Sequence, residues 1–156
     1  MSYIITDEQC DLILRRFEIA PKDFRKMVDT RLDDELFNEI LVLSTEGAAS
    51  NESGWTEDGK IAESLLDTIV AIEYNQAREF SRINRKALAK DDVCGCFYCM
   101  SIFSPKEIEE WVPERWGSKK EVTALCPHCG IDSVIGASSG YPITVDFLRG
   151  MNKISF

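Results

Sequence analysis

The sequence predicts a mainly α-helical protein that carries a small module of mixed α and β structure near its C-terminal end. Apolar residues recur at helical spacing through most of residues 1–93, which is typical of a helical bundle. From residue 94 onward the chain contains closely spaced cysteines, aromatic residues and turn-forming residues instead. A length of 156 residues suits one domain with a small appended module. We therefore expect an acidic helical region at 1–93 and a four-cysteine module at 94–156.

Three short helices are expected in the N-terminal region. Thr6-Asp-Glu-Gln9 has the pattern of a capping box, in which the Thr6 and Gln9 side chains each satisfy a backbone group of the first helical turn. The apolar stripe that follows should end before Pro21, because proline restricts the residue that precedes it. A second helix is expected from Pro21, and a third over residues 32–43.

The next segment predicts a loop followed by the longest helix. Residues 44–60 lack apolar periodicity and are rich in glycine, serine and asparagine, and Trp55 is expected to fold back onto the core. The long helix should then span residues 57–89, since neither glycine nor proline interrupts it after Gly59. Its basic last turns suit the negative end of a helix dipole better than a phosphate site: Arg78, Arg82, Arg85 and Lys86.

The charge is acidic and unevenly distributed. Eighteen lysines and arginines against 27 aspartates and glutamates give a net charge of −9. Residues 1–93 hold 12 basic and 20 acidic side chains, and residues 94–156 hold 6 and 7. Such a surface repels phosphate backbones, which disfavours non-specific binding of DNA or RNA. It favours plain solubility or a basic protein partner.

The cysteines and the absence of an export pattern indicate a reducing compartment. No apolar run approaches the ~20 residues that cross a bilayer, and the first residues lack the basic and apolar regions of a signal peptide. We therefore expect a cytoplasmic protein without membrane association. Six cysteines in such a chain indicate metal ligation rather than disulfides.

Four of these cysteines have the spacing of a metal site. Cys96-Phe-Tyr-Cys99 is followed, after 26 residues, by Cys126-Pro-His-Cys129-Gly130. Two residues between cysteines allow a tight turn to direct both thiolates at one ion, and two such knuckles supply the tetrahedral set that zinc prefers. We expect a structural Zn²⁺ ion bound by Cys96, Cys99, Cys126 and Cys129. Iron is the main rival, and a dithiol redox pair or a disulfide is weaker.

Three further residues are secondary candidates. Cys94 lies two residues before Cys96 and could replace it, but it lacks the two-residue spacing. His128 is the one histidine of the chain, and inside the second knuckle its ring is expected to point away from the metal. Cys10 is expected to be a small, partly buried helix side chain.

The remaining elements of the module are short. Ser104-Pro-Lys-Glu107 is a capping box that predicts an inserted helix, which Pro113 should end. Residues 122–125 favour a strand, and Thr144 should cap a last helix. The aromatic residues are expected mostly to pack around the metal, with Trp116 as an exposed exception.

The sequence disfavours an enzyme. Four thiolates close the metal shell, one histidine is too few for an ordinary metallohydrolase, and no phosphate loop or Ser/His/Asp order is present. We expect a non-enzymatic, zinc-stabilised protein that binds another protein, and a neutraliser of a toxin or of a defence enzyme is one such role. The alternative is a nucleic-acid-binding or regulatory protein that uses the module through Arg115, Trp116, Lys119 and Lys120.

The cysteine module resembles a known family. Residues 96–111 together with Thr123-Ala-Leu-Cys-Pro-His-Cys-Gly-Ile-Asp-Ser-Val-Ile-Gly136 resemble the zinc-ribbon-type C-terminal module of a family of small bacterial cytoplasmic proteins of uncharacterised role. The likeness continues through residues 141–149 and covers about 60 of the 156 residues. It implies a zinc-knuckle (ribbon or treble-clef-like) module with the same four ligands, and it implies no activity. Residues 1–93 show no resemblance.

Overall fold

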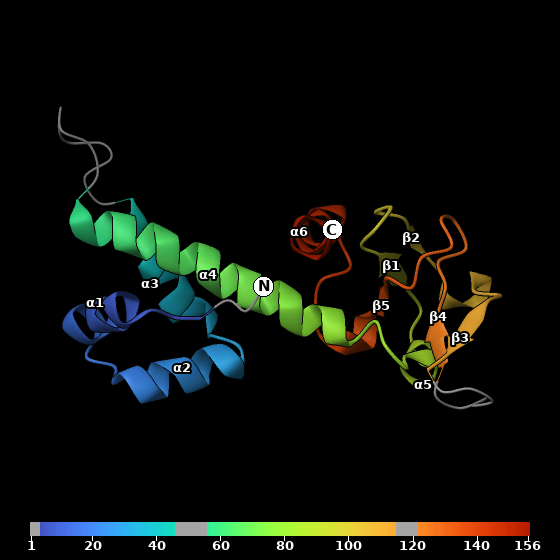
Figure 1. Cartoon of the computed structure of the whole chain (residues 1–156), viewed down its shortest axis with the longest axis horizontal. Coiled ribbons are helices and arrows are strands. Elements are labelled where there is room, and N and C mark those ends of the chain that lie inside the picture. Colours follow the sequence, from blue (N-terminus) through green and yellow to red (C-terminus); the bar gives the residue numbers. More distant parts are fainter. Residues whose placement is uncertain (1–3, 46–55, 115–121) are drawn as a thin grey trace. The chain divides into compact units, whose positions relative to one another are not determined.

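The computed structural model describes residues 4–45, 56–114 and 122–156 (Figure 1). The chain forms two compact units, residues 1–73 (unit 1) and residues 74–156 (unit 2). The boundary between the units lies within helix α4 (Glu57–Glu79). Residues 74–93 therefore belong to unit 2, whereas the sequence composition assigns them to the helical region. Trp55 lies outside the described residues. No helix in the described ranges is long and apolar enough to cross a membrane.

Unit 1 is helical, as predicted. Its elements are α1 (Asp7–Phe17), α2 (Pro21–Asp29), α3 (Asp34–Ser44) and the larger part of α4. The capping box of α1 is confirmed, because Thr6 Oγ1 accepts from Gln9 N at 3.2 Å and Gln9 Oε1 accepts from Thr6 N at 2.9 Å. Helix α3 begins at Asp34 rather than residue 32, since Asp33 is the residue that caps it.

The core of unit 1 is large and apolar. Its fully buried side chains include Leu12, Ile13, Phe24, Ile40 and Leu65. Cys10 belongs to this core with 2% of its surface exposed, which is deeper than the partial burial that the sequence predicts. Burial raises the pKa of the Cys10 thiol, so this side chain behaves as a small apolar residue.

The prediction of one long helix over 57–89 is wrong beyond residue 79. Helix α4 ends at Glu79, and a single helical turn, α5 (Arg85–Leu88), follows. Between them Ile83 adopts a left-handed conformation with φ 47°, and its N–H donates to Thr123 Oγ1 at 2.9 Å. Hydrogen bonds to a distant strand thus replace helical ones. Phe80 and Ile83, which follow the end of α4, are 46% and 48% exposed.

Unit 2 contains two small antiparallel sheets and a terminal helix (Figure 1). The first sheet has the order β2-β1-β5, and the second pairs β3 with β4. Thr144 caps the last helix as predicted, with Oγ1 accepting from Phe147 N at 3.3 Å. The bounds are β1 (Cys94–Cys96), β2 (Ile102–Phe103), β3 (Trp111–Pro113), β4 (Val122–Ala124), β5 (Val134–Gly136) and α6 (Val145–Ser155).

The two faces of the three-stranded sheet contact different groups. Side chains alternate along a strand, so Cys94 and Cys96 lie on one face and Gly95 on the other. Cys94 and Cys96 belong to the apolar cluster that includes Phe103. On the opposite face a Cβ at Gly95 would lie 2.7 Å from Leu148 Cδ1 of α6, so glycine lets this helix approach the sheet closely. The sheet therefore separates the cysteine side of unit 2 from the core beneath α6.

The predicted inserted helix is also wrong. The capping box is present, since Ser104 N donates to Glu107 Oε1 at 2.9 Å, but it starts only one 3₁₀ turn, Pro105–Glu107. The chain then becomes extended and enters β3, whose residues pair with β4, the strand predicted over residues 122–125. Pairing between strands outweighs the local helix signal here, because it satisfies the backbone groups that a helix would have paired.

Candidate metal centre

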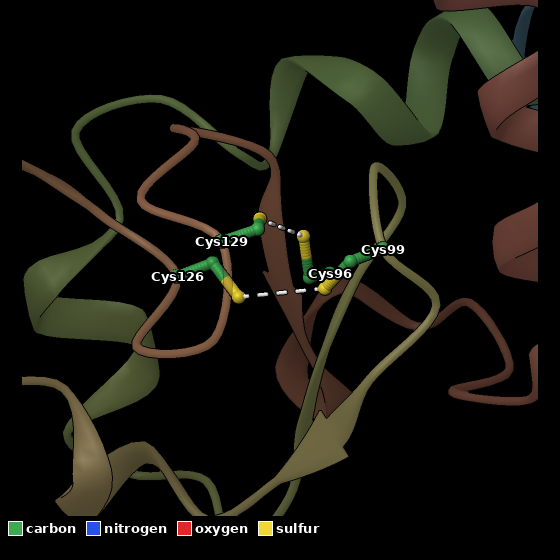
Figure 2. Close-up of side chains that lie close together, drawn as sticks. All are labelled: Cys96, Cys99, Cys126 and Cys129. Carbon is green, nitrogen blue, oxygen red and sulfur yellow. Dashed lines mark hydrogen bonds between the residues drawn. The ribbon is translucent and has the colours of Figure 1, made fainter.

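The structure brings the four predicted cysteines together (Figure 2). Cys96 ends β1, Cys99 lies in the turn between β1 and β2, and Cys126 and Cys129 lie between β4 and β5. Their Sγ atoms all lie within 4.8 Å of one another. Two close approaches cross between the pairs: Cys96 to Cys129 and Cys99 to Cys126, each with Sγ atoms 3.7 Å apart.

Both cysteine pairs sit in turns of the same construction. In the first turn Cys96 N donates to Ser101 O at 2.9 Å and Met100 N donates to Cys96 O at 2.8 Å. The second turn repeats this pattern with the same distances, from Cys126 N to Ile131 O and from Gly130 N to Cys126 O. The residue after the second cysteine is left-handed in both, with φ 61° at Met100 and 75° at Gly130. A Cβ costs energy in this conformation, so glycine suits the second turn.

Backbone N–H groups point at the sulfurs, as the spacing of the pairs predicts. The N–H of Ser101 bonds to the sulfur of Cys99, and the N–H of Ile131 bonds to that of Cys129, at equivalent places in the two turns. Cys126 receives two such bonds, from the N–H groups of His128 and Cys129. These dipoles stabilise negative charge on sulfur, which a metal-binding thiolate requires.

The distances fit a tetrahedral ion better than disulfides. Zinc–sulfur bonds of about 2.3 Å place tetrahedral sulfurs about 3.8 Å apart, close to the two cross-pair distances of 3.7 Å. A disulfide needs about 2.05 Å between the sulfurs, and all six cysteines are free thiols. The remaining separations do not exceed 4.8 Å, so tetrahedral geometry requires an inward shift of at most about 1 Å.

Burial and hydrogen bonds shift the pKa values of Cys99, Cys126 and Cys129. Burial raises the pKa of Cys126 to about 11 and also raises that of Cys129. Burial opposes ionisation of Cys99 too, but the hydrogen bonds that its sulfur forms with the hydroxyl and the N–H of Ser101 outweigh burial and lower the pKa of Cys99 to about 7. At neutral pH a cation is therefore needed to convert Cys126 and Cys129 to the thiolates that bind metals.

The secondary candidates do not join the cluster. The buried Cys94 donates from Sγ to Phe103 O at 3.4 Å, and burial raises its pKa to about 12. His128 is exposed, and its ring packs edge-on against Phe103 with centroids 5.2 Å apart. Arg115, Trp116, Lys119 and Lys120, the set expected to contact nucleic acid, lie outside the described residues.

The aromatic residues of the module divide between its two sides. Phe103 and Trp111 pack in the cluster that contains the cysteines, which agrees with the expected role. Phe97 instead joins the core beneath α6, and Tyr98 is 45% exposed. Packing around the cysteines therefore accounts for only part of this set.

Two buried polar residues that sequence reasoning missed support the cluster. Ser133 Oγ lies 3.0 Å from the Sγ of Cys96. Asn84 Nδ2 donates to Val134 O at 2.8 Å, and Asn84 Oδ1 accepts from Ala124 N at 3.0 Å. Asn84 thus ties together the two strands that flank the second cysteine turn. The low helix propensity of asparagine is the signal in the sequence that could have indicated an end of the long helix before Asn84.

Comparison of this chain with family models, curated proteins and solved structures finds no match. The candidate metal centre therefore rests on its own geometry, and the comparisons do not support the expected resemblance to a bacterial zinc-ribbon family.

Proposed function

We propose that Cys96, Cys99, Cys126 and Cys129 hold one Zn²⁺ ion in a closed site, as in a zinc-ribbon or treble-clef-like module. The observation that carries this proposal is the convergence of four Sγ atoms from two turns of matching construction. Backbone N–H groups directed at the sulfurs support it.

The role that fits this ion is structural. Four thiolates fill the tetrahedral shell of zinc and leave no position for water or substrate, whereas a catalytic zinc keeps one open. The strands of unit 2 are only two or three residues long, and three cysteines are part of its apolar cluster, so packing alone stabilises them weakly. Metal binding would then supply much of the folding free energy of this unit.

The function that these features support is binding of a protein partner rather than catalysis. Residues 1–73 carry 7 basic and 17 acidic side chains, a net charge of −10, whereas residues 74–156 carry 11 and 10, a net charge of +1. Charge concentrated in this way accelerates association with a basic partner and repels nucleic acid. A basic toxin or defence enzyme that this protein neutralises belongs to that class of partner.

The metal half of the proposal is tested by elemental analysis and native mass spectrometry of freshly purified protein. We expect one zinc per chain, with iron absent. Iron in place of zinc would keep the four-thiolate site but change its occupant, and protein without any metal would contradict the proposal.

The binding half is tested by affinity capture with the zinc-loaded chain over 50 to 200 mM salt. We expect a basic protein whose retention falls as salt screens the charges. Capture of nucleic acid instead, with a strong salt dependence of its affinity, would favour the alternative role of the module.

A further inference from the structure

A hollow of about 1040 Å³ lies among α1, α2 and α3 of unit 1. Its apolar lining comes from the end of α1 and its following residues, from α2 and from α3: Phe17, Ile19, Met27, Leu36, Val42 and Leu43. Three of these side chains are partly buried against the core of the unit, namely Phe17, Ile19 and Met27. Val42 has 65% of its surface exposed, which is high for an aliphatic side chain. Within the described residues of unit 1, the hollow therefore offers apolar surface that remains exposed.

The charged residues around this hollow are not balanced. Arg15 and Arg16 line it, but both pair with Asp58, at 3.2 Å and 3.6 Å. Glu18, Glu35 and Glu39 also line it, are exposed, and form no ion pair within the described part of the chain. The hollow thus combines an apolar floor with a rim on which four acidic side chains, those three glutamates and Asp33, outnumber two basic ones.

The arrangement of these residues indicates the shape of the ligand. Glu35, Glu39 and Val42 follow one another at helical spacing on one stripe of α3. The described part of unit 1 contains no strand, so it offers no sheet edge to which an extended peptide could add. Recognition must then use side chains, and an apolar hollow beside a helix stripe suits the apolar face of another helix.

We infer that this hollow is the docking site for an amphipathic, lysine- or arginine-rich helix of a partner protein. Apolar side chains of that helix would contact Phe17, Met27 and Val42, and its basic side chains would face Glu18, Glu35 and Glu39. This inference rests on the proposed protein-binding function and names the place and the chemistry of the contact.

The test uses the full-length, zinc-loaded chain and a defined probe. The probe is a 15-residue synthetic helix with leucine at positions i, i+3, i+4 and i+7 and lysine elsewhere, and a second peptide has glutamate in place of lysine. We expect the lysine peptide to shift amide NMR signals of α1, α2 and α3, and the glutamate peptide to leave them unchanged.

Matched variants locate the contact. The pair Glu35→Gln and Glu39→Gln should raise the Kd of the lysine peptide about fivefold, because each exposed charge pair contributes modestly. The control pair Glu63→Gln and Asp67→Asn removes two exposed charges at the same spacing on α4 and should leave the Kd within about twofold. Val42→Ser should weaken binding, whereas Leu41→Ser, which alters the neighbouring exposed residue outside the hollow, should not.

Several results would overturn the inference. Equal losses of peptide affinity in the two charge-pair variants would mean that overall charge, and not the hollow, attracts the peptide. Signal changes confined to residues outside α1, α2 and α3 would place the contact elsewhere. No binding of the lysine peptide would also contradict the inference. Concentration-dependent shifts of the same signals without peptide would show that a second copy of the chain occupies the hollow. A captured native partner that still binds the Glu35→Gln, Glu39→Gln and Val42→Ser variants would preserve the protein-binding function and remove the hollow as its site.

Discussion

The two compact units bury different kinds of side chain. Unit 1 buries large aliphatic and aromatic side chains between helices, with Leu12, Ile13, Phe24 and Ile40 fully inaccessible. In unit 2 the cysteines themselves form part of the apolar cluster, and the strands around them are very short. The comparison predicts that the helical core of unit 1 keeps its order without an ion, whereas unit 2 needs one.

Removal of the metal should give the largest effect and should separate the units. Apparent zinc-binding free energies in small modules are about 10–16 kcal/mol, more than the short strands of unit 2 can replace by packing. Treatment with a strong chelator should therefore abolish amide protection in β1, β2 and β5, while α1 and α3 retain it. Hydrogen exchange read by mass spectrometry measures both units in one experiment. Equal protection of both units with and without metal would mean that the ion is peripheral.

Loss of one ligand should act almost as strongly. Cys99→Ser removes one of the four clustered thiols and should abolish stoichiometric metal content. Cys94→Ser and Cys10→Ser are matched controls, because both residues are buried cysteines that do not belong to the four-cysteine group. Elemental analysis of the three variants checks this. If Cys94→Ser lost its metal while Cys99→Ser kept it, the ligand set proposed here would be wrong.

Metal affinity should depend steeply on pH. Burial raises the pKa of Cys126 and Cys129, so both thiols hold protons between pH 6 and 8 until a cation displaces them. These two released protons, together with the part of a proton that Cys99 releases, increase the apparent affinity at least about 100-fold for each unit of rising pH. Calorimetry in buffers of different ionisation enthalpy counts these protons. An affinity that is flat from pH 6 to 8 would contradict the protonation state assigned to this site.

A smaller effect should follow the loss of the Asn84 side chain. Asn84→Ala leaves the buried groups Val134 O and Ala124 N without partners, and each unsatisfied group costs about 1–3 kcal/mol. Denaturant unfolding of the metal-loaded protein should show a loss of about 2–6 kcal/mol in unit 2. Asn38→Ala, on the exposed face of α3, is the control and should change the free energy of unfolding by less than about 0.5 kcal/mol. Similar losses in the two variants would exclude a specific bracing role for Asn84.

The features that could be predicted from the sequence depend on neighbours in the chain. The caps at Thr6 and Thr144 bond to backbone groups three residues away, and the spacing within each cysteine pair sets its turn. The end of α4 could not be predicted this way, because the partners of Asn84 lie 40 and 50 residues further along the chain. The helix expected after Ser104 does not form, also because of a partner distant in the chain: β4 pairs with residues 111–113, which the prediction had placed in that helix.

X-ray absorption spectroscopy at the zinc edge tests the central claim most directly. It reports the ligand atoms and their distances in the purified, full-length protein. A zinc ion held by Cys96, Cys99, Cys126 and Cys129 predicts four sulfur scatterers at about 2.3 Å and no nitrogen or oxygen ligand. Fewer than four sulfurs, or a nitrogen or oxygen in the shell, would contradict a closed structural site.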